Sequence, residues 1–248
     1  MVLGVADKGG KKGPSLGLRP ATPTHITQQC QRVIIGQFTM ESSATRSESV
    51  FKNYTTVMRI LSEEVQHIIA LARGQDFGTP GTAVDVTNLS VINRRLLVRS
   101  VCAFCEGLAY CLKQLPLSGL GAELTPIERA LVLEEDYELD SNGRPMVRPA
   151  RLKTLNNLRF ALELLPRKMG ASFAPEYSDH GWEALQLTIK VRDRITHPKM
   201  AGDLEISDDE IRNAVRAYYW LHSQNALFLT AALNRSTEIM TKNRTRPV

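Results

Sequence analysis

Apolar positions recur along most of the chain at intervals of three and four residues, which is the period of an amphipathic α-helix. Residues 41–73 follow this pattern, and Gly74 ends it. A second helix is predicted over residues 88–114. Its stretch from 96 to 112 is apolar on nearly every side, which predicts a central helix enclosed by its neighbours.

Capping and turn signals place the next elements. The Thr-Pro-Ile-Glu run at 125–128 predicts the start of a short helix that ends near residue 134. Residues 137–147 predict a small hairpin, with Asn142-Gly143 at its turn.

Three further helices are expected after the hairpin. They are placed at residues 152–165, ended by Pro166; 178–197, capped by Ser178 and stopped by Pro198; and 207–234, opened by a Ser207–Glu210 capping box. The sequence shows no internal repeat and no second hydrophobic centre. We therefore predict an all-α fold, a helical bundle of about five to six helices with a small β-hairpin insertion.

Charge divides the chain unevenly. The net charge is +5, and residues 1–40 hold five basic groups and one acidic group, or 5 − 1 = +4. We expect this segment to be a flexible basic extension, either simply solvated or adding loose affinity for phosphates. Residues 41–235 are expected to form one α-helical domain, with the short helix and hairpin at about 122–150 inserted. Residues 236–248 are expected to form a C-terminal tail.

Composition excludes several classes of protein. No run approaches the ~18 apolar residues of a membrane-spanning helix, and no apolar segment follows the N-terminal lysines as in a secretory signal. Four cysteines in 248 residues suit a reducing compartment, so we expect a cytoplasmic protein without a membrane partner. A P-loop, a dinucleotide fingerprint, H-E-x-x-H and G-x-S-x-G are all absent from the sequence. We expect no cofactor and no metal.

The segment KVRDRITHPK at 190–199 carries unusual charges for a helix. On a helical wheel Arg192 falls inside the apolar arc, and because a guanidinium stays charged it requires an anionic or interfacial partner. Asp193 and His197 lie one turn apart on the polar face, together with Lys190. The carboxylate of Asp193 can therefore hydrogen-bond the imidazole and raise its basicity.

The central helix carries a matching polar stripe. Its members are Arg95, Arg99, Cys102, Glu106 and Lys113. Glu106 is a natural counter-charge for Arg192. A buried salt bridge that only braces two core helices is an equally good interpretation of that pair.

The run from Arg192 to His197 resembles the R-x4-H motif of HEPN domains, in which the residue after Arg is often Asn, Asp or His. The order of the helices is also similar, and the resemblance covers residues 41–235. Lys199 stands where HEPN toxins paired with a nucleotidyltransferase antitoxin often carry Tyr, which argues against that pairing.

The resemblance implies a homodimer in which two R-x4-H helices face each other across a cleft. It also implies a metal-independent endoribonuclease, often a toxin or antiphage effector, with RNA as substrate and an antitoxin or defence protein as a possible partner. His197 would act as general acid or base, Arg192 would clamp the phosphate and Asp193 would orient His197. Attack by the 2′-hydroxyl would leave a 2′,3′-cyclic phosphate. The supporting or RNA-binding residues would be Arg95, Arg99, Glu106, Lys190 and Arg194.

The alternative is a catalytically inactive HEPN-like dimer that serves as a binding or scaffolding module. The near-neutral charge of the globular part favours it, because nucleases that act on long RNA usually carry a more basic surface. A weaker third possibility is a substrate-binding partner of an enzyme encoded nearby.

Other combinations of residues have simpler interpretations. Cys102-x-x-Cys105 lies in the predicted central helix without a second ligand pair, so we interpret it as core packing. Glu64-x-x-His67 has the spacing of a di-iron ligand pair but lacks a second such pair, so we interpret it and Glu63 as a solvated face. Tyr218 and His222 are interpreted as core or dimer contacts, with base stacking as the alternative.

Overall fold

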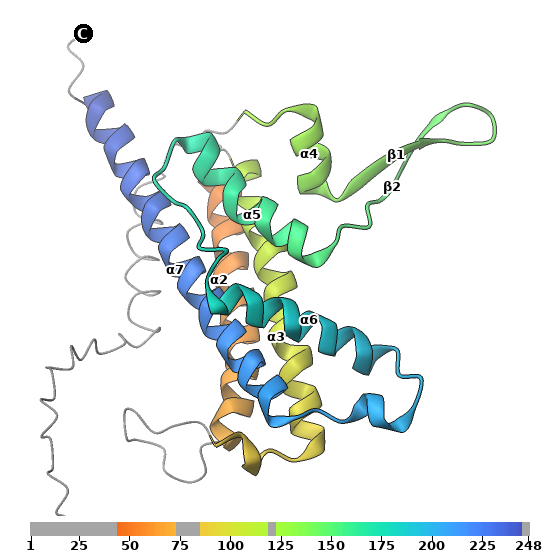
Figure 1. Ribbon diagram of the computed structural model, residues 1–248. Helices are drawn as coiled ribbons and strands as arrows, with labels where there is room; N and C mark the ends of the chain where they lie inside the picture. Colours follow the sequence, from red (N-terminus) through yellow and green to blue (C-terminus); the bar gives the residue numbers. More distant parts are fainter. Residues whose placement is uncertain (1–43, 73–84, 119–122, 245–248) are drawn as a thin grey trace, which may run out of the picture.

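The computed structural model describes residues 44–72, 85–118 and 123–244. Within them it contains α2 (Ala44–Ala72), α3 (Val91–Gln114), α4 (Pro126–Leu133), β1 (Glu135–Leu139), β2 (Pro145–Pro149), α5 (Thr154–Met169), α6 (His180–Thr196) and α7 (Asp208–Arg244). Short 3₁₀ turns lie at η1 (Val86–Asn88), η2 (Leu115–Ser118) and η3 (Ala201–Leu204). The predicted all-α bundle with one small hairpin is confirmed (Figure 1).

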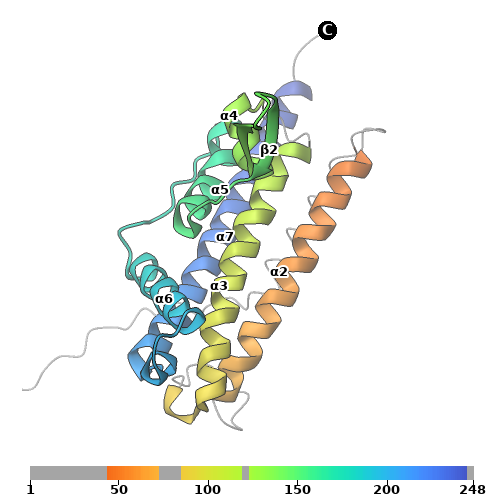
Figure 2. The same ribbon diagram turned by 90° about the vertical axis from the view of Figure 1, so that its right-hand side faces the viewer.

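α3 is the centre of the bundle, as its apolar sequence predicts. It contacts α2, α5, α6 and α7, and Val101, Phe104 and Leu108 on it are fully buried. Figure 2 shows α2 lying alongside α3, with α5, α6 and α7 on the other side. The predicted site residues lie on α3 itself and at the end of α6, which packs against α3.

The two predicted capping boxes are both present. Thr125 accepts a hydrogen bond from the Glu128 N–H, and the Glu128 carboxylate accepts one from the Thr125 N–H at 2.8 Å. Ser207 and Glu210 exchange the same pair of bonds at the start of α7. Each box satisfies backbone donors that a helix start leaves free, which is why both helices begin where the sequence indicates.

Several helix ends differ from the prediction. α3 begins at Val91 rather than at residue 88, because Ser90 caps it, and α5 begins at Thr154 rather than at residue 152. α5 continues through Pro166 to Met169, because the proline is buried in the core and Gly170, with φ +63°, caps the helix beyond it. α6 begins after Asp179 rather than Ser178, whose hydroxyl bonds Glu176 instead. α7 runs to Arg244, well past Asn234.

The longer α7 is in contact with α5 just past its predicted end. Nε of Arg235 donates to the Met169 carbonyl at the end of α5 (2.8 Å), and its guanidinium also pairs with Glu238. These contacts support the first turn beyond the predicted end, and residues 236–244, predicted as part of a tail, are helical. The predicted extension at 1–40 and the last residues, 245–248, lie outside the described residues.

The hairpin projects from the bundle as an arm (Figure 1). β1 pairs with β2 antiparallel, with Tyr137 opposite Val147, and Gly143 adopts φ +75° at the predicted turn. At the base of the arm, Glu134 accepts a 2.6 Å hydrogen bond from Lys113, which is fully buried in α3.

In the part of the chain that the structure describes, no helix combines the length and the apolar character needed to cross a membrane.

Candidate functional site

The predicted site lies where α6 ends. His197 is the C-cap: its N–H donates to the Asp193 carbonyl at 3.1 Å, and its φ and ψ of −125° and 57° leave the helical region. Pro198 disfavours the α conformation for the residue before it, which explains the break. The side chain of His197 is exposed, so the imidazole is open to a ligand from solvent.

Arg192 on α6 reaches toward α3 and pairs there with Glu106, its predicted counter-charge. Its Nη2 is 2.8 Å from Oε1 of Glu106 and 3.5 Å from the hydroxyl of Thr154, the first residue of α5. Its Nη1 is 3.4 Å from the Asp193 carboxylate. The exposed fractions of the Arg192 and Glu106 side chains are 27% and 52%, so the ion pair lies at the surface edge of the helix interface.

One atom of Arg192 stays unsatisfied. Its Nε is buried and has no hydrogen-bond partner among the described residues. The guanidinium adjoins the buried thiol of Cys102 on α3. Burial raises the pKa of that thiol to about 12, so it remains protonated and is no nucleophile. Cys102 and Cys105 are both buried, which confirms their interpretation as core.

Asp193 interacts differently from the expectation. Its carboxylate faces Arg192, and the hydrogen bond it shares with His197 runs through the backbone. In the described structure the carboxylate makes no hydrogen bond to the imidazole. The backbone carbonyl of Asp193 accepts the last hydrogen bond of α6, as any residue at this position would, and its carboxylate faces the guanidinium.

The other predicted basic residues divide into two groups. Nη2 of Arg99 lies 3.5 Å from the Ile195 carbonyl, which places this exposed arginine beside the last turn of α6. Arg95 lies one turn earlier on α3 and is half-buried. Lys190 is exposed on the face of α6 that carries His197. Of these three cations, Arg99 contacts the last turn of α6, and Lys190 lies nearly two turns before its end.

Arg194 belongs to a different contact. Its guanidinium lies 3.0 Å from the Glu210 carboxylate and donates to the Glu205 carbonyl at 2.9 Å. It therefore ties α6 to the start of α7, and its charge is neutralised there. The structure does not bring Arg194 together with the other predicted site residues.

Sequence reasoning missed two residues that shape the site. Asp203 accepts hydrogen bonds from the N–H groups of Lys199 and Met200, at 2.7 and 3.1 Å, and these bonds lower the pKa of its carboxyl. It thereby fixes the loop that follows His197. Thr154 contacts Arg192 from α5, but nothing in the local sequence indicates this long-range contact.

The aromatic and acidic clusters match their simpler interpretations. His222 is half-buried, stacks on Phe104 with ring centroids 5.0 Å apart, and lies 3.1 Å from the Ser62 hydroxyl. Burial lowers the pKa of its imidazole to about 4. Glu63, Glu64 and His67 are exposed on α2. Among the described residues no three His, Cys, Asp or Glu side chains gather as a metal site would require.

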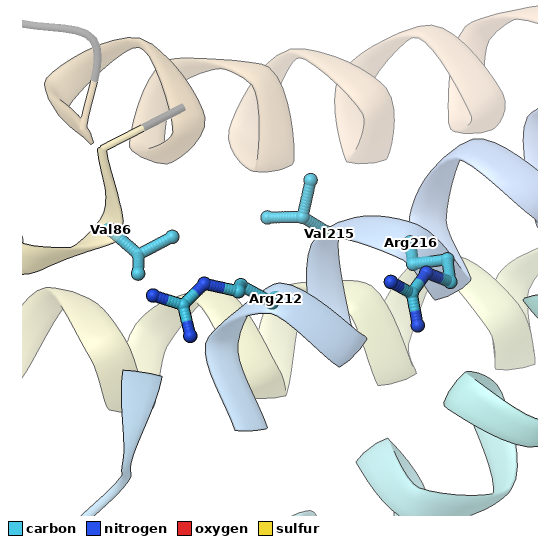
Figure 3. A pocket seen from close by; sticks show the side chains of 4 residues that line it. All are labelled: Val86, Arg212, Val215 and Arg216. Carbon is cyan, nitrogen blue, oxygen red and sulfur yellow. The ribbon is translucent and has the colours of Figure 1, made fainter. Parts of the chain in front are cut away.

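A pocket of about 250 Å³ lies elsewhere, between η1 and α7 (Figure 3). Val86, Val215 and two arginines one turn apart, Arg212 and Arg216, line it. Arg212 is paired with Asp209 at 2.6 Å. None of the predicted site residues lines this pocket.

Comparison of the chain with family models, with curated proteins and with solved structures finds no match.

Proposed function

We propose that the chain is a metal-independent endoribonuclease of HEPN type, and that the end of α6 is its active site. The observation that supports the proposal is an exposed imidazole, His197, at the end of α6, with Arg192 five residues earlier on the same helix and Arg99 of α3 in contact with the Ile195 carbonyl. A histidine suits proton transfer near neutral pH, and arginine suits the recognition of phosphate.

The proposed reaction breaks one phosphodiester bond of RNA. The 2′-hydroxyl oxygen attacks phosphorus, the bond from phosphorus to the 5′-oxygen breaks, and a 2′,3′-cyclic phosphate forms. The 2′-hydroxyl proton passes to one imidazole, and the leaving 5′-oxygen receives a proton from a second. Arg192 binds the non-bridging oxygens and stabilises the charge that develops on them.

Two imidazoles require two copies of the chain, because each contributes one His197. The R-x4-H helices would meet across a shared cleft. Exposed apolar side chains lie at the same end of the bundle: Ile92 and Leu96 on α3 are 62% and 44% exposed, and Met200 after α6 is 70% exposed. Covering them would favour such a homodimer.

In a cell, an enzyme of this kind would act in the cytoplasm as a toxin or an antiphage effector. An antitoxin or another defence protein would then hold its activity in check.

A second function is favoured by one observation. The guanidinium of Arg192 is already paired with Glu106 and lies near Asp193. A substrate phosphate would have to compete with these carboxylates. If it cannot, the protein is an inactive HEPN-like dimer that binds a partner or serves as a scaffold.

The test is RNA cleavage in the presence of EDTA by the wild type, His197→Ala and His180→Ala. His180 is the matched control because it lies at the opposite end of α6 and its side chain is 86% exposed. The proposal predicts cleavage by the wild type and His180→Ala, and a loss of at least about 100-fold in His197→Ala, the usual contribution of a general acid or base.

Equal cleavage by all three proteins would contradict the proposal and indicate a contaminating nuclease. No cleavage by any of them, combined with RNA binding or partner binding by the wild type, would favour the inactive module.

A further inference from the structure

The projecting hairpin has two edges of different chemistry. In an antiparallel pair, residues whose N–H and C=O groups bond across the ladder alternate with residues whose groups point outward. Backbone bonds join Ala150 to Glu134 and Asp140 to Arg144 at the two ends of the hairpin. Counting in steps of two, the outward-pointing groups of β1 belong to Glu135, Tyr137 and Leu139.

The outer edge of β2 is blocked. Its outward positions are Pro145, Val147 and Pro149, and a proline has no N–H to donate. The outer edge of β1 carries an N–H at each position. The N–H of Tyr137 confirms the direction, because it donates to the Asp136 carboxylate at 2.9 Å rather than to β2. Only the β1 edge of this hairpin can therefore pair fully with a further strand.

The two faces of the arm also differ. Tyr137, Leu139 and Val147 share one face, and their side chains are 60%, 66% and 55% exposed. Asp136 and Glu138 lie on the other face, where Glu138 pairs with Arg148. Figure 1 shows the arm extending clear of the helices, so the bundle does not cover either face.

We propose that the β1 edge binds an extended segment of a partner polypeptide in which basic and apolar residues alternate. Such a segment would add a third strand to the sheet. Its apolar side chains would lie beside Tyr137 and Leu139, and its lysines or arginines beside Asp136 and Glu138. A two-stranded sheet is marginally stable alone, and a third strand would stabilise it. This inference is independent of the proposed ribonuclease activity.

The same charges disfavour a second copy of the arm as the occupant. If two β1 strands paired antiparallel about Tyr137, each Asp136 would face a Glu138 of the other copy. Like charges directly opposite destabilise a strand pair, and charged side chains on an edge strand disfavour self-association. A basic partner strand turns this repulsion into attraction. It must also replace the bond between Asp136 and the Tyr137 N–H.

The first test uses the full chain and a synthetic ten-residue peptide of alternating Lys and Val, titrated at low salt. The controls are a peptide of alternating Glu and Val, and a peptide of alternating Lys and Pro, in which proline replaces every valine. We expect the Lys–Val peptide to bind at least tenfold more tightly than either control. Binding that is absent, or equal among the three peptides, would overturn the proposal.

A matched pair of variants locates the binding edge. Tyr137→Pro removes an outward N–H of β1, and Val147→Pro removes one from β2, so neither variant breaks a bond of the hairpin ladder. We expect Tyr137→Pro to weaken binding of the Lys–Val peptide at least tenfold and Val147→Pro to leave it unchanged. Equal affinities of the two variants would overturn the assignment to β1.

Hydrogen exchange on the wild type gives a readout that needs no variant. Bound peptide should slow exchange of the outward amides of Tyr137 and Leu139 and leave those of Asp136 and Glu138 little changed. Protection of the Leu139 amide before any peptide is added would overturn the proposal; the Tyr137 amide does not serve for this comparison, because it already donates to the Asp136 carboxylate. If that protection rises with protein concentration, a second copy of the chain occupies the edge. If it is independent of concentration, another segment of the same chain occupies it.

Discussion

Glu106 is the residue that decides how available Arg192 is to a phosphate. Its carboxylate lies 2.8 Å from Nη2 of the guanidinium, and half of its side chain is exposed. An ion pair in this position contributes little to folding, typically below about 1 kcal/mol, but it places a negative charge where a substrate phosphate would bind.

We therefore predict that Glu106→Gln, made in the inactive His197→Ala background, binds single-stranded RNA severalfold more tightly at low salt. The free energy of unfolding should fall by less than about 1 kcal/mol. Glu64→Gln, with the same charge change on the exposed face of α2, is the control and should leave the affinity unchanged. Equal affinities of the two variants would show that Arg192 does not contact RNA.

His222 predicts a pH dependence of stability. Its folded-state pKa of about 4 lies below the ordinary value of 6.5, so the unfolded chain takes up a proton first as the pH falls. The contribution of His222 to stability is complete above about pH 6.5 and is lost between there and about pH 4.

We expect His222→Gln to flatten the fall in unfolding free energy over that interval, measured by urea denaturation at several pH values. His67→Gln is the control, because His67 is exposed on α2 and should keep the wild-type slope. If His222→Gln and the wild type have the same slope, the imidazole is not packed against Phe104 and shielded from water in the way the structure shows.

At the scale of elements, the position of α6 depends on its close approach to α7. A Cβ added at Gly181 would lie within 2.5 Å of the Cβ and Cγ of Trp220. These atoms join the indole ring to the backbone, so they cannot move aside as the end of a flexible side chain can. At Gly107, where α3 meets α2, the nearest atom is the flexible end of Leu61, also at 2.5 Å.

Gly181→Ala should therefore destabilise the protein by about 1–3 kcal/mol, the usual cost of overpacking. Gly107→Ala should cost less, because a leucine can change rotamer and the helix gains up to about 1 kcal/mol from alanine. Thermal unfolding of the two variants measures the difference. A smaller loss in Gly181→Ala would contradict the observed packing of α6 on α7.

Much of this element structure could be predicted from local sequence. Apolar periodicity indicates α2 and α3, and the Thr125 and Ser207 boxes mark two helix starts, because these signals act within one turn of helix. The continuation of α5 through Pro166 could not be predicted in this way. It depends on burial against distant helices, which outweighs the local cost of a proline.

At the scale of the whole molecule, the candidate site shows the same division. The position of Arg192 in an apolar arc predicts an anionic partner, and Glu106 is found there. The pairing of Arg194 with Glu210 and the contact of Thr154 with Arg192 depend on how three helices meet. No local pattern contains that information, and the direction of the hairpin arm is likewise set by the fold.

The assembled molecule separates two surfaces. The end of α6 carries exposed cations and an imidazole, whereas the hairpin arm carries carboxylates and an apolar face. Under the two proposals these surfaces take different partners, RNA at the first and a basic strand at the second. A ribonuclease built in this way would bind its partner through the arm and leave the end of α6 open to RNA.

The central claim, that His197 and Arg192 act on an RNA phosphodiester through its 2′-hydroxyl, is tested most directly with two oligonucleotides. They are identical except for a single 2′-deoxynucleotide on the 5′ side of the cleaved bond. The account predicts that the wild type cuts the all-RNA oligonucleotide to a 2′,3′-cyclic phosphate and leaves the substituted bond intact. Cleavage of the substituted bond at the same rate, or products ending in a 3′-hydroxyl, would contradict it.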